Sequence, residues 1–165
     1  MFQNLERKYL MTVAEELVKK LIEKNYSISC AESCTGGKLT GSIVDVADAS
    51  KVLQASVVTY SNEAKQQYLE VSEDTLRQFG AVSEETAREM AIGIAKNNDA
   101  QIGVSVTGTA GPGGGTKEKP VGTVCFGFYV NGVVKTVRKQ FGDIGRNNVR
   151  DASVKYALET VLSML

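Results

Sequence analysis

The chain has 165 residues, and its 19 Lys and Arg are balanced by 19 Asp and Glu. This length, with 42% hydrophobic residues, predicts a single domain over residues 1–165 with a substantial core. The balanced charge gives no reason to expect a nucleic acid or a membrane surface as partner. No apolar run approaches the roughly 20 residues that span a bilayer, and residues 1–8 lack the apolar core of a signal peptide. We therefore expect a cytoplasmic protein.

The sequence contains no histidine and three cysteines, Cys30, Cys34 and Cys125. Their odd number and the lack of a Cys-x-x-Cys pair argue against a disulfide framework and a zinc site. We expect reduced, buried thiols, no bound metal and no cofactor. Without histidine, the base that activates any nucleophile has to be a lysine, a carboxylate or a tyrosine.

Residues 1–60 read as alternating helices and strands. Apolar residues from Leu5 to Ile22 recur at helical spacing and predict a helix over about 4–24. A short buried strand at 27–32 follows, then a glycine turn and a helix near 36–46. The β-branched run at 52–60 predicts a second strand.

Three serines mark the starts of the next helices. Ser61 precedes a short helix that ends at Leu69. Ser72 and Ser83 are each followed by two acidic residues, which suit the positive end of a helix. They predict helices over about 72–79 and 83–97.

The last part of the chain predicts three strands and a closing helix. A buried strand at 102–107 leads into a glycine-rich loop. Strands at 121–130 and 133–140 are joined by Asn131-Gly132, which is typical of a type I′ turn. A helix over about 146–165 is expected to turn Val149, Ala152, Tyr156 and Leu162 inward. The fold class is α/β: a three-layer α/β/α sandwich around a mixed sheet of about five strands.

A serine lies at the first strand-to-helix turn, in Ala31-Glu32-Ser33-Cys34-Thr35-Gly36-Gly37. Small residues at such a junction leave main-chain N–H groups exposed and place Ser33 within reach of a substrate. The arrangement resembles a nucleophile on an elbow. Ser33 is therefore a candidate nucleophile.

The glycine-rich loop after the third strand, residues 108–116, is a second candidate site. Glycines permit positive φ, so successive N–H groups can form an anion-binding nest. The loop matches neither the P-loop nor the dinucleotide-binding fingerprint. A flexible surface loop is the alternative interpretation.

Four further side chains are candidates on position alone. Arg146 and Arg150 are four residues apart and share a helix face, where they can grip a phosphate or carboxylate. Two solvated side chains explain that spacing equally well. Tyr60 and Lys65 lie where the second strand turns into a helix, and a desolvated lysine can act as a base near neutral pH. Taken alone, Lys65 is equally well explained as a surface charge. Tyr60 taken alone is equally well explained as an aromatic side chain at the edge of the core.

Together these segments resemble the CinA C-terminal domain family, whose active members are nicotinamide-nucleotide amidases. The similarity covers residue 5 to the C-terminus and comprises five ordered blocks. They are Ala-Glu-Ser-Cys-Thr-Gly-Gly (31–37), Val-Val-Thr-Tyr-Ser-Asn-Glu-Ala-Lys (57–65), Gly-Ala-Val-Ser (80–83), Ser-Val-Thr-Gly-Thr-Ala-Gly-Pro-Gly-Gly-Gly-Thr (105–116) and Lys-Pro-Val-Gly-Thr-Val (119–124). Two local departures are Gly145 before Arg146, where the family usually has Asp, and Thr109 in place of an aliphatic residue.

The resemblance implies an amidohydrolase that converts nicotinamide mononucleotide (NMN) to nicotinate mononucleotide and ammonia. It implies Ser33 as nucleophile, Lys65 as base and Tyr60 as assistant, and whether Lys65 or Tyr60 accepts the proton directly stays open. It also leaves open whether Arg146 or Arg150 holds the phosphate. The remaining expected substrate-binding residues are Glu32, Cys34, Thr35, Gly36, Thr107, Gly108, Thr109, Gly111, Gly113, Gly114 and Gly115.

Two other functions are compatible with the same sequence. One is a catalytically silent module that binds a nucleotide or regulates, although such a module needs neither nucleophile nor base. The other is a hydrolase of a different amide. We expect a homodimer, because two-fold dimers are the commonest assembly.

Overall fold

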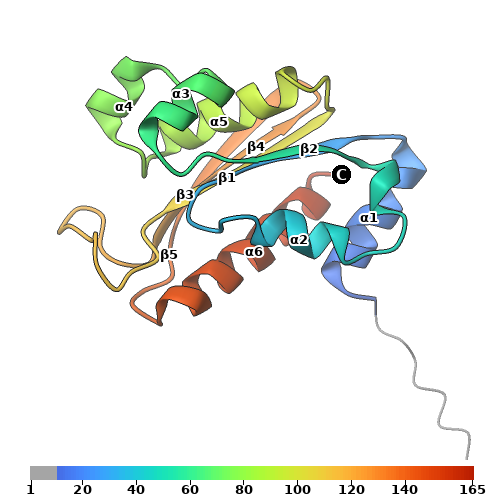
Figure 1. The fold of residues 1–165 in the computed structure, drawn as a ribbon. Helices are drawn as coiled ribbons and strands as arrows, with labels where there is room; N and C mark the ends of the chain where they lie inside the picture. Colours follow the sequence, from blue (N-terminus) through green and yellow to red (C-terminus); the bar gives the residue numbers. More distant parts are fainter. Residues whose placement is uncertain (1–10) are drawn as a thin grey trace, which may run out of the picture.

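A computed structural model describes residues 11–165, in which helices cover both faces of one sheet (Figure 1). A short 3-10 turn, η1 (Ala49–Lys51), precedes the second strand. One face carries α3 (Asn62–Leu69), α4 (Glu73–Phe79) and α5 (Glu84–Lys96). The other carries α1 (Val13–Lys24), α2 (Lys38–Val44) and α6 (Arg146–Ser163).

The sheet is mixed and has five strands in the order β2-β1-β3-β4-β5. β1 pairs in parallel with β2 and β3, whereas β3–β4 and β4–β5 are antiparallel. The predicted α/β/α sandwich is therefore confirmed. The strand bounds are β1 (Ile28–Glu32), β2 (Leu53–Val58), β3 (Ile102–Gly108), β4 (Thr123–Val130) and β5 (Val133–Gln140).

The hairpin turn and the helix N-caps predicted from the sequence are found in the structure. Asn131 and Gly132 have φ of 47° and 89°, and positive values at both positions are what a type I′ hairpin turn requires. The Ser61, Ser72 and Ser83 hydroxyls each accept a main-chain N–H in the first turn of their helix.

The terminal helices differ from the prediction in detail. Helix α1 begins at Val13, because Thr12 and Glu15 form a capping box there; residues 4–10 of the predicted helix lie outside the described residues. On α6 Val149 is buried and the half-buried Tyr156 and Leu162 pack against the larger core, as predicted, whereas Ala152 is half-buried and is not part of that core. The buried stripe consists of Val149, Ser153, Val154, Ala157, Leu158, Thr160 and Val161.

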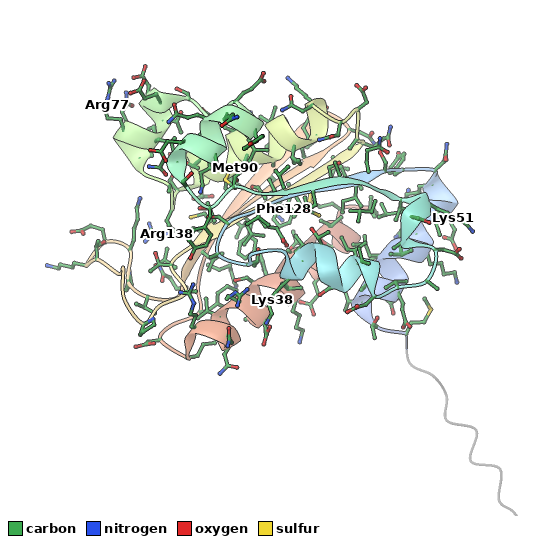
Figure 2. All side chains as sticks on the ribbon, in the orientation of Figure 1. Lys38, Lys51, Arg77, Met90, Phe128 and Arg138 are labelled. Atoms are coloured by element: carbon green, nitrogen blue, oxygen red, sulfur yellow. The ribbon has the colours of Figure 1, made fainter. Side chains whose placement is uncertain are left out.

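Two apolar cores hold the layers together. The larger lies between the sheet and α1, α2 and α6, and it contains Phe126 and Phe128. Figure 2 shows Phe128 and Met90 inside the molecule, whereas Arg77 lies at its outer rim. The smaller core, beneath α3, α4 and α5, is formed by Ala31, Leu69, Val71, Leu76, Met90 and Ile94. Among the described residues, no helix has the length and apolar character needed to cross a membrane.

The backbone of helix α5 is in direct contact with the backbone of the sheet. A Cβ added at Gly103 of β3 would lie 2.2 Å from the Ala91 carbonyl oxygen, and one at Gly127 of β4 would lie 2.2 Å from that of Ala87. Only glycine fits such contacts, because real Cβ atoms do not approach a carbonyl oxygen so closely. These glycines therefore fix how close α5 comes to the strands.

The same close packing predicts opposite effects for two helical glycines. An added Cβ at Gly93 of α5 would lie 2.1 Å from the Leu69 carbonyl oxygen, whereas one at Gly41 of α2 meets nothing within 4 Å. We expect Gly93→Ala to lower the free energy of unfolding by about 1–3 kcal/mol or more, and Gly41→Ala to raise it by about 0.5–1 kcal/mol. Urea unfolding of the two variants measures both; a Gly93→Ala variant as stable as the wild type would contradict the packing argument.

Candidate functional site

The candidate site lies at the carboxyl ends of the three neighbouring parallel strands. Ser33 follows β1, Thr59 and Tyr60 follow β2, and the glycine-rich loop follows β3. In open α/β sheets this edge is where ligand sites form. The first turns of α6 pack against the same edge, so four segments distant in sequence meet there.

Ser33 and Lys65 form a buried pair. The Lys65 Nζ lies 3.1 Å from the Ser33 Oγ. Lys65 is 1% exposed and Ser33 is 8% exposed. The amine also donates to the main-chain carbonyls of Thr59 at 2.7 Å and Tyr60 at 3.4 Å. No carboxylate within residues 11–165 forms a salt bridge with Lys65.

This environment favours the neutral amine. Burial lowers the pKa of Lys65, an effect that the nearby Cys34 thiol opposes only in part. A neutral amine has two N–H donors and one lone pair. In that form the two carbonyls accept its N–H groups, and the serine hydroxyl can donate to the lone pair. The pair thus has the arrangement of a nucleophile and its base.

Tyr60 contacts the site through its main chain more directly than through its hydroxyl. Its carbonyl accepts from Lys65, whereas its phenol oxygen lies 3.2 Å from the Arg146 Nη2. The Arg146 Nη1 donates to the Gly111 carbonyl at 2.7 Å. Arg146 therefore links the start of α6, the turn after β2 and the glycine-rich loop.

A cavity of about 240 Å³ has Cys34, the neighbour of Ser33, on its wall, whereas Ser33 and Lys65 themselves do not line it. It is lined by Cys34, Tyr60, Gly108, Thr109, Ala110, Gly111, Gly113, Gly114 and Arg146. All of these except Ala110 were expected at a substrate site. Ala110 was missed because nothing in its side chain marks it, and Thr59 was missed because it contributes a carbonyl rather than a functional side chain.

The other predicted site residues lie around the cavity rather than on its wall. Thr107 is 1% exposed and its hydroxyl donates to the Ala81 carbonyl at 2.8 Å. Arg150 donates to the carbonyls of Cys34 and Thr35. Gly36 lies next to Arg150 and Gly115 next to Val121. The three cysteines are buried free thiols, as expected.

Glu32 caps the start of α2 from the neighbouring strand. Gly37 has no side chain to cap this helix, and the Glu32 Oε1 accepts the main-chain N–H of Thr40 at 3.1 Å instead. The carboxyl group is fully buried, and burial raises its pKa. Main-chain N–H groups at the start of α2 act in the opposite direction and lower the pKa by a smaller amount. Glu32 therefore anchors the segment that carries Ser33. Within residues 11–165, no group of three or more His, Cys, Asp or Glu side chains is arranged to hold a metal ion.

The sequence matches the CinA C-terminal domain family over residues 10–165. The chain belongs to this family. A CinA-like protein from Kosmotoga olearia is 52% identical over 148 residues, which are 89% of this chain and 36% of that protein. The chain thus spans about a third of the length of the curated relatives it matches.

Solved structures of the family share the fold. A competence/damage inducible protein from Agrobacterium tumefaciens superposes with a TM-score of 0.87 at 42% identity, covering 93% of this chain and 96% of that one. A CinA superfamily protein from Escherichia coli gives 0.89 at 32% identity, covering 100% and 99%. The resemblance deduced from the sequence blocks is confirmed.

The cap formed by Glu32 predicts a contrast between two substitutions. Glu32→Gln keeps an acceptor for the Thr40 N–H, whereas Glu32→Ala removes it and should lower the free energy of unfolding by about 1–3 kcal/mol. Because burial raises the pKa of Glu32, its ionisation is unfavourable in the folded state. The stability from its protonated form is therefore lost as pH rises through that raised pKa.

Glutamine cannot ionise, so the stability of Glu32→Gln relative to the wild type should increase from pH 5 to pH 8. Thermal unfolding across this range measures it, with Glu85→Ala on the exposed first turn of α5 as control. A Glu32→Ala variant as stable as the control would contradict the anchoring role.

Proposed function

We propose that the chain is an amidohydrolase that deamidates NMN to nicotinate mononucleotide and ammonia, in pyridine-nucleotide recycling. The observation that carries the chemistry is the Ser33–Lys65 pair, buried with two carbonyls and no acidic partner among the described residues. The choice of substrate rests on membership of the CinA family and on its matched blocks.

In the first half of the reaction, Lys65 acts as base. The Ser33 Oγ attacks the carboxamide carbon while its proton passes to the neutral Lys65 amine. The carbonyl oxygen becomes an oxyanion, for which the N–H groups of the loop after Ser33 are the nearest donors in sequence. When the C–N bond breaks, Lys65 returns the proton to the leaving nitrogen. Ammonia departs and an ester on Ser33 remains.

In the second half, water replaces ammonia. Lys65 takes a proton from the attacking water, whose oxygen adds to the ester carbon. The bond to Ser33 Oγ then breaks, and Lys65 returns the proton to that oxygen. The product is a carboxylic acid, which loses its proton to solvent and becomes a carboxylate, and the enzyme is restored.

Arg146 is the better placed of the two arginines for the phosphate of the substrate. It is exposed and lines the cavity, and its recorded hydrogen bonds use two of the five guanidinium N–H groups. The remaining donors can meet a phosphate beside the glycine-rich loop. Tyr60, held by the same guanidinium, is then a wall for the nicotinamide moiety and an assistant to Lys65 through its carbonyl.

The substrate assignment predicts a preference for the mononucleotide. NMN should release ammonia well, whereas free nicotinamide and glutamine should hardly react, because neither offers a phosphate to Arg146. Arg146→Met should raise KM for NMN and leave the low rate on nicotinamide unchanged. Ser33→Ala should lower kcat by more than about 100-fold without unfolding the protein. Equal rates on NMN and nicotinamide would contradict this assignment, and no ammonia release at all would favour the silent module.

The assignment of Lys65 as base predicts a pH dependence. Because burial lowers the pKa of Lys65, kcat/KM should rise with pH through an ionisation below the ordinary lysine pKa of about 10.4. Lys65→Arg should be nearly as damaging as Lys65→Met, since arginine keeps the charge and does not give up its proton. The exposed Lys19→Arg on α1 is the matched control. Retention of most of the rate by Lys65→Arg would show that another group is the base.

A further inference from the structure

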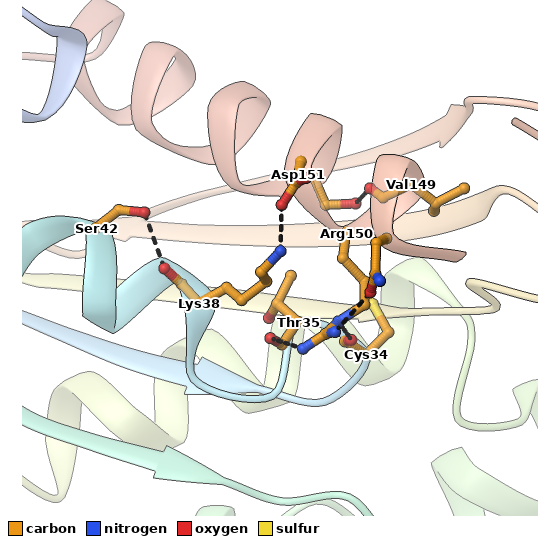
Figure 3. A network of polar contacts seen from close by, with 9 residues as sticks. Cys34, Thr35, Lys38, Ser42, Val149, Arg150 and Asp151 are labelled. Carbon is orange, nitrogen blue, oxygen red and sulfur yellow. Dashed lines mark hydrogen bonds and ion pairs between the residues drawn. The ribbon is translucent and has the colours of Figure 1, made fainter. Parts of the chain in front are cut away.

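Arg150 holds the loop that follows the nucleophile. It lies in the second turn of α6, and its guanidinium points at the 33–36 segment (Figure 3). The Nε donates to the Cys34 carbonyl and the Nη2 to the Thr35 carbonyl, both at 3.0 Å. The Nη1 donates to the Asn147 Oδ1 at 3.0 Å, which steadies the guanidinium from its own helix.

These two bonds fix the directions of two successive peptide planes. In a trans peptide the C=O and the following N–H point in opposite directions. Because the Cys34 carbonyl points at Arg150, the Thr35 N–H points away from it. The next peptide behaves alike: the Thr35 carbonyl faces Arg150, and the Gly36 N–H donates to the Ser33 carbonyl at 3.1 Å. Within residues 11–165 neither the Cys34 nor the Thr35 N–H donates to another residue; Thr35 is fully buried, whereas Cys34 lies on the cavity wall.

We propose that Arg150 is a positioning residue that holds the nucleophile loop, and with it the oxyanion-binding N–H groups after Ser33, instead of binding the substrate phosphate. The inference rests on the proposed amide hydrolysis at Ser33. Arg150 commits three of its five N–H donors, two of them to main-chain carbonyls, and does not line the cavity, whereas Arg146 commits two and does line it.

The surroundings of the loop fit this role. Gly36 has φ of +56°, and a Cβ there would lie 3.3 Å from the Arg150 Nη2, so a glycine serves both the turn and the guanidinium. At the far end of the loop Glu32 caps α2, and Lys38 pairs with Asp151, the neighbour of Arg150 (Figure 3). Arg150 is thus one anchor of a segment that is fixed at both ends.

Arginine suits this task better than lysine. Its planar fork presents Nε and Nη2 at a fixed separation, which matches two adjacent carbonyls. An ammonium is a point charge that holds one carbonyl well and leaves the second peptide plane free to turn. We therefore expect Arg150→Lys to be a damaging substitution despite its conserved charge.

The experiment measures how fast Ser33 reacts with an alkyl fluorophosphonate probe. Ser33 Oγ attacks phosphorus, the P–F bond breaks, fluoride leaves and the serine proton passes to Lys65. The phosphoryl oxygen occupies the position of an oxyanion, so the labelling rate reports on the loop donors without any assumed substrate. Arg150→Lys and Arg150→Ala should label about 10–100-fold more slowly than the wild type. Arg88→Ala, an exposed arginine on α5, should label at the wild-type rate.

Two further measurements separate positioning from misfolding and from phosphate binding. Guanidinium at millimolar concentration should restore labelling of Arg150→Ala in a saturable way, which a misfolded chain would not show. With NMN, the Arg150 variants should lower kcat and change KM less than about threefold. Labelling within twofold of the wild type, or a KM increase of tenfold or more with unchanged kcat, would overturn the proposal. If the wild type labels at Ser33 but does not hydrolyse NMN, the proposed substrate fails and the role of Arg150 is still decided by the labelling rates.

Discussion

The burial of the Lys65 amine without a carboxylate partner is the constraint on which the site depends. A buried ammonium lacking a counter-charge is strongly unfavourable, so such a lysine either leaves the core or becomes neutral. Here burial lowers the pKa of the amine, while two main-chain carbonyls and the Ser33 hydroxyl are its hydrogen-bond partners. The position of Lys65 in the first turn of α3 acts in the same direction, because the positive end of a helix disfavours a cation.

That arrangement depends in turn on how the layers meet. Ser61 caps α3 and sets the turn from which Lys65 projects, while β1 brings Ser33 to the same edge. Helix α5 supports α3 through the close contact of Gly93 with Leu69, and it lies against glycines of β3 and β4. Backbone-to-backbone packing leaves little freedom for these elements to shift. The fold thereby holds a serine and a lysine, 32 residues apart in sequence, within hydrogen-bonding distance.

The sequence predicted the elements well because their signals are local. Serine caps, an Asn-Gly turn and β-branched runs act through neighbours in the chain, and the structure bears them out at Ser61, Ser72 and Asn131. The inner face of α6 was predicted less well. Its buried stripe includes Ser153 and Thr160, polar residues whose burial depends on which helix lies opposite. The functions of Thr59 and Glu32 could not be predicted from the sequence either. Thr59 acts through its main-chain carbonyl, and Glu32 caps a helix in a different segment.

Arg146 and Arg150 show why sequence spacing identifies a face but not a function. Four residues apart, they point in the same direction and are displaced along α6 by about 6 Å. That displacement separates two environments. At the mouth of the site Arg146 meets a phenol and one carbonyl and keeps donors exposed. One turn further along, Arg150 meets two carbonyls of consecutive peptides and points inward. The same side chain is thus suited to a ligand at the first position and to the protein's own backbone at the second.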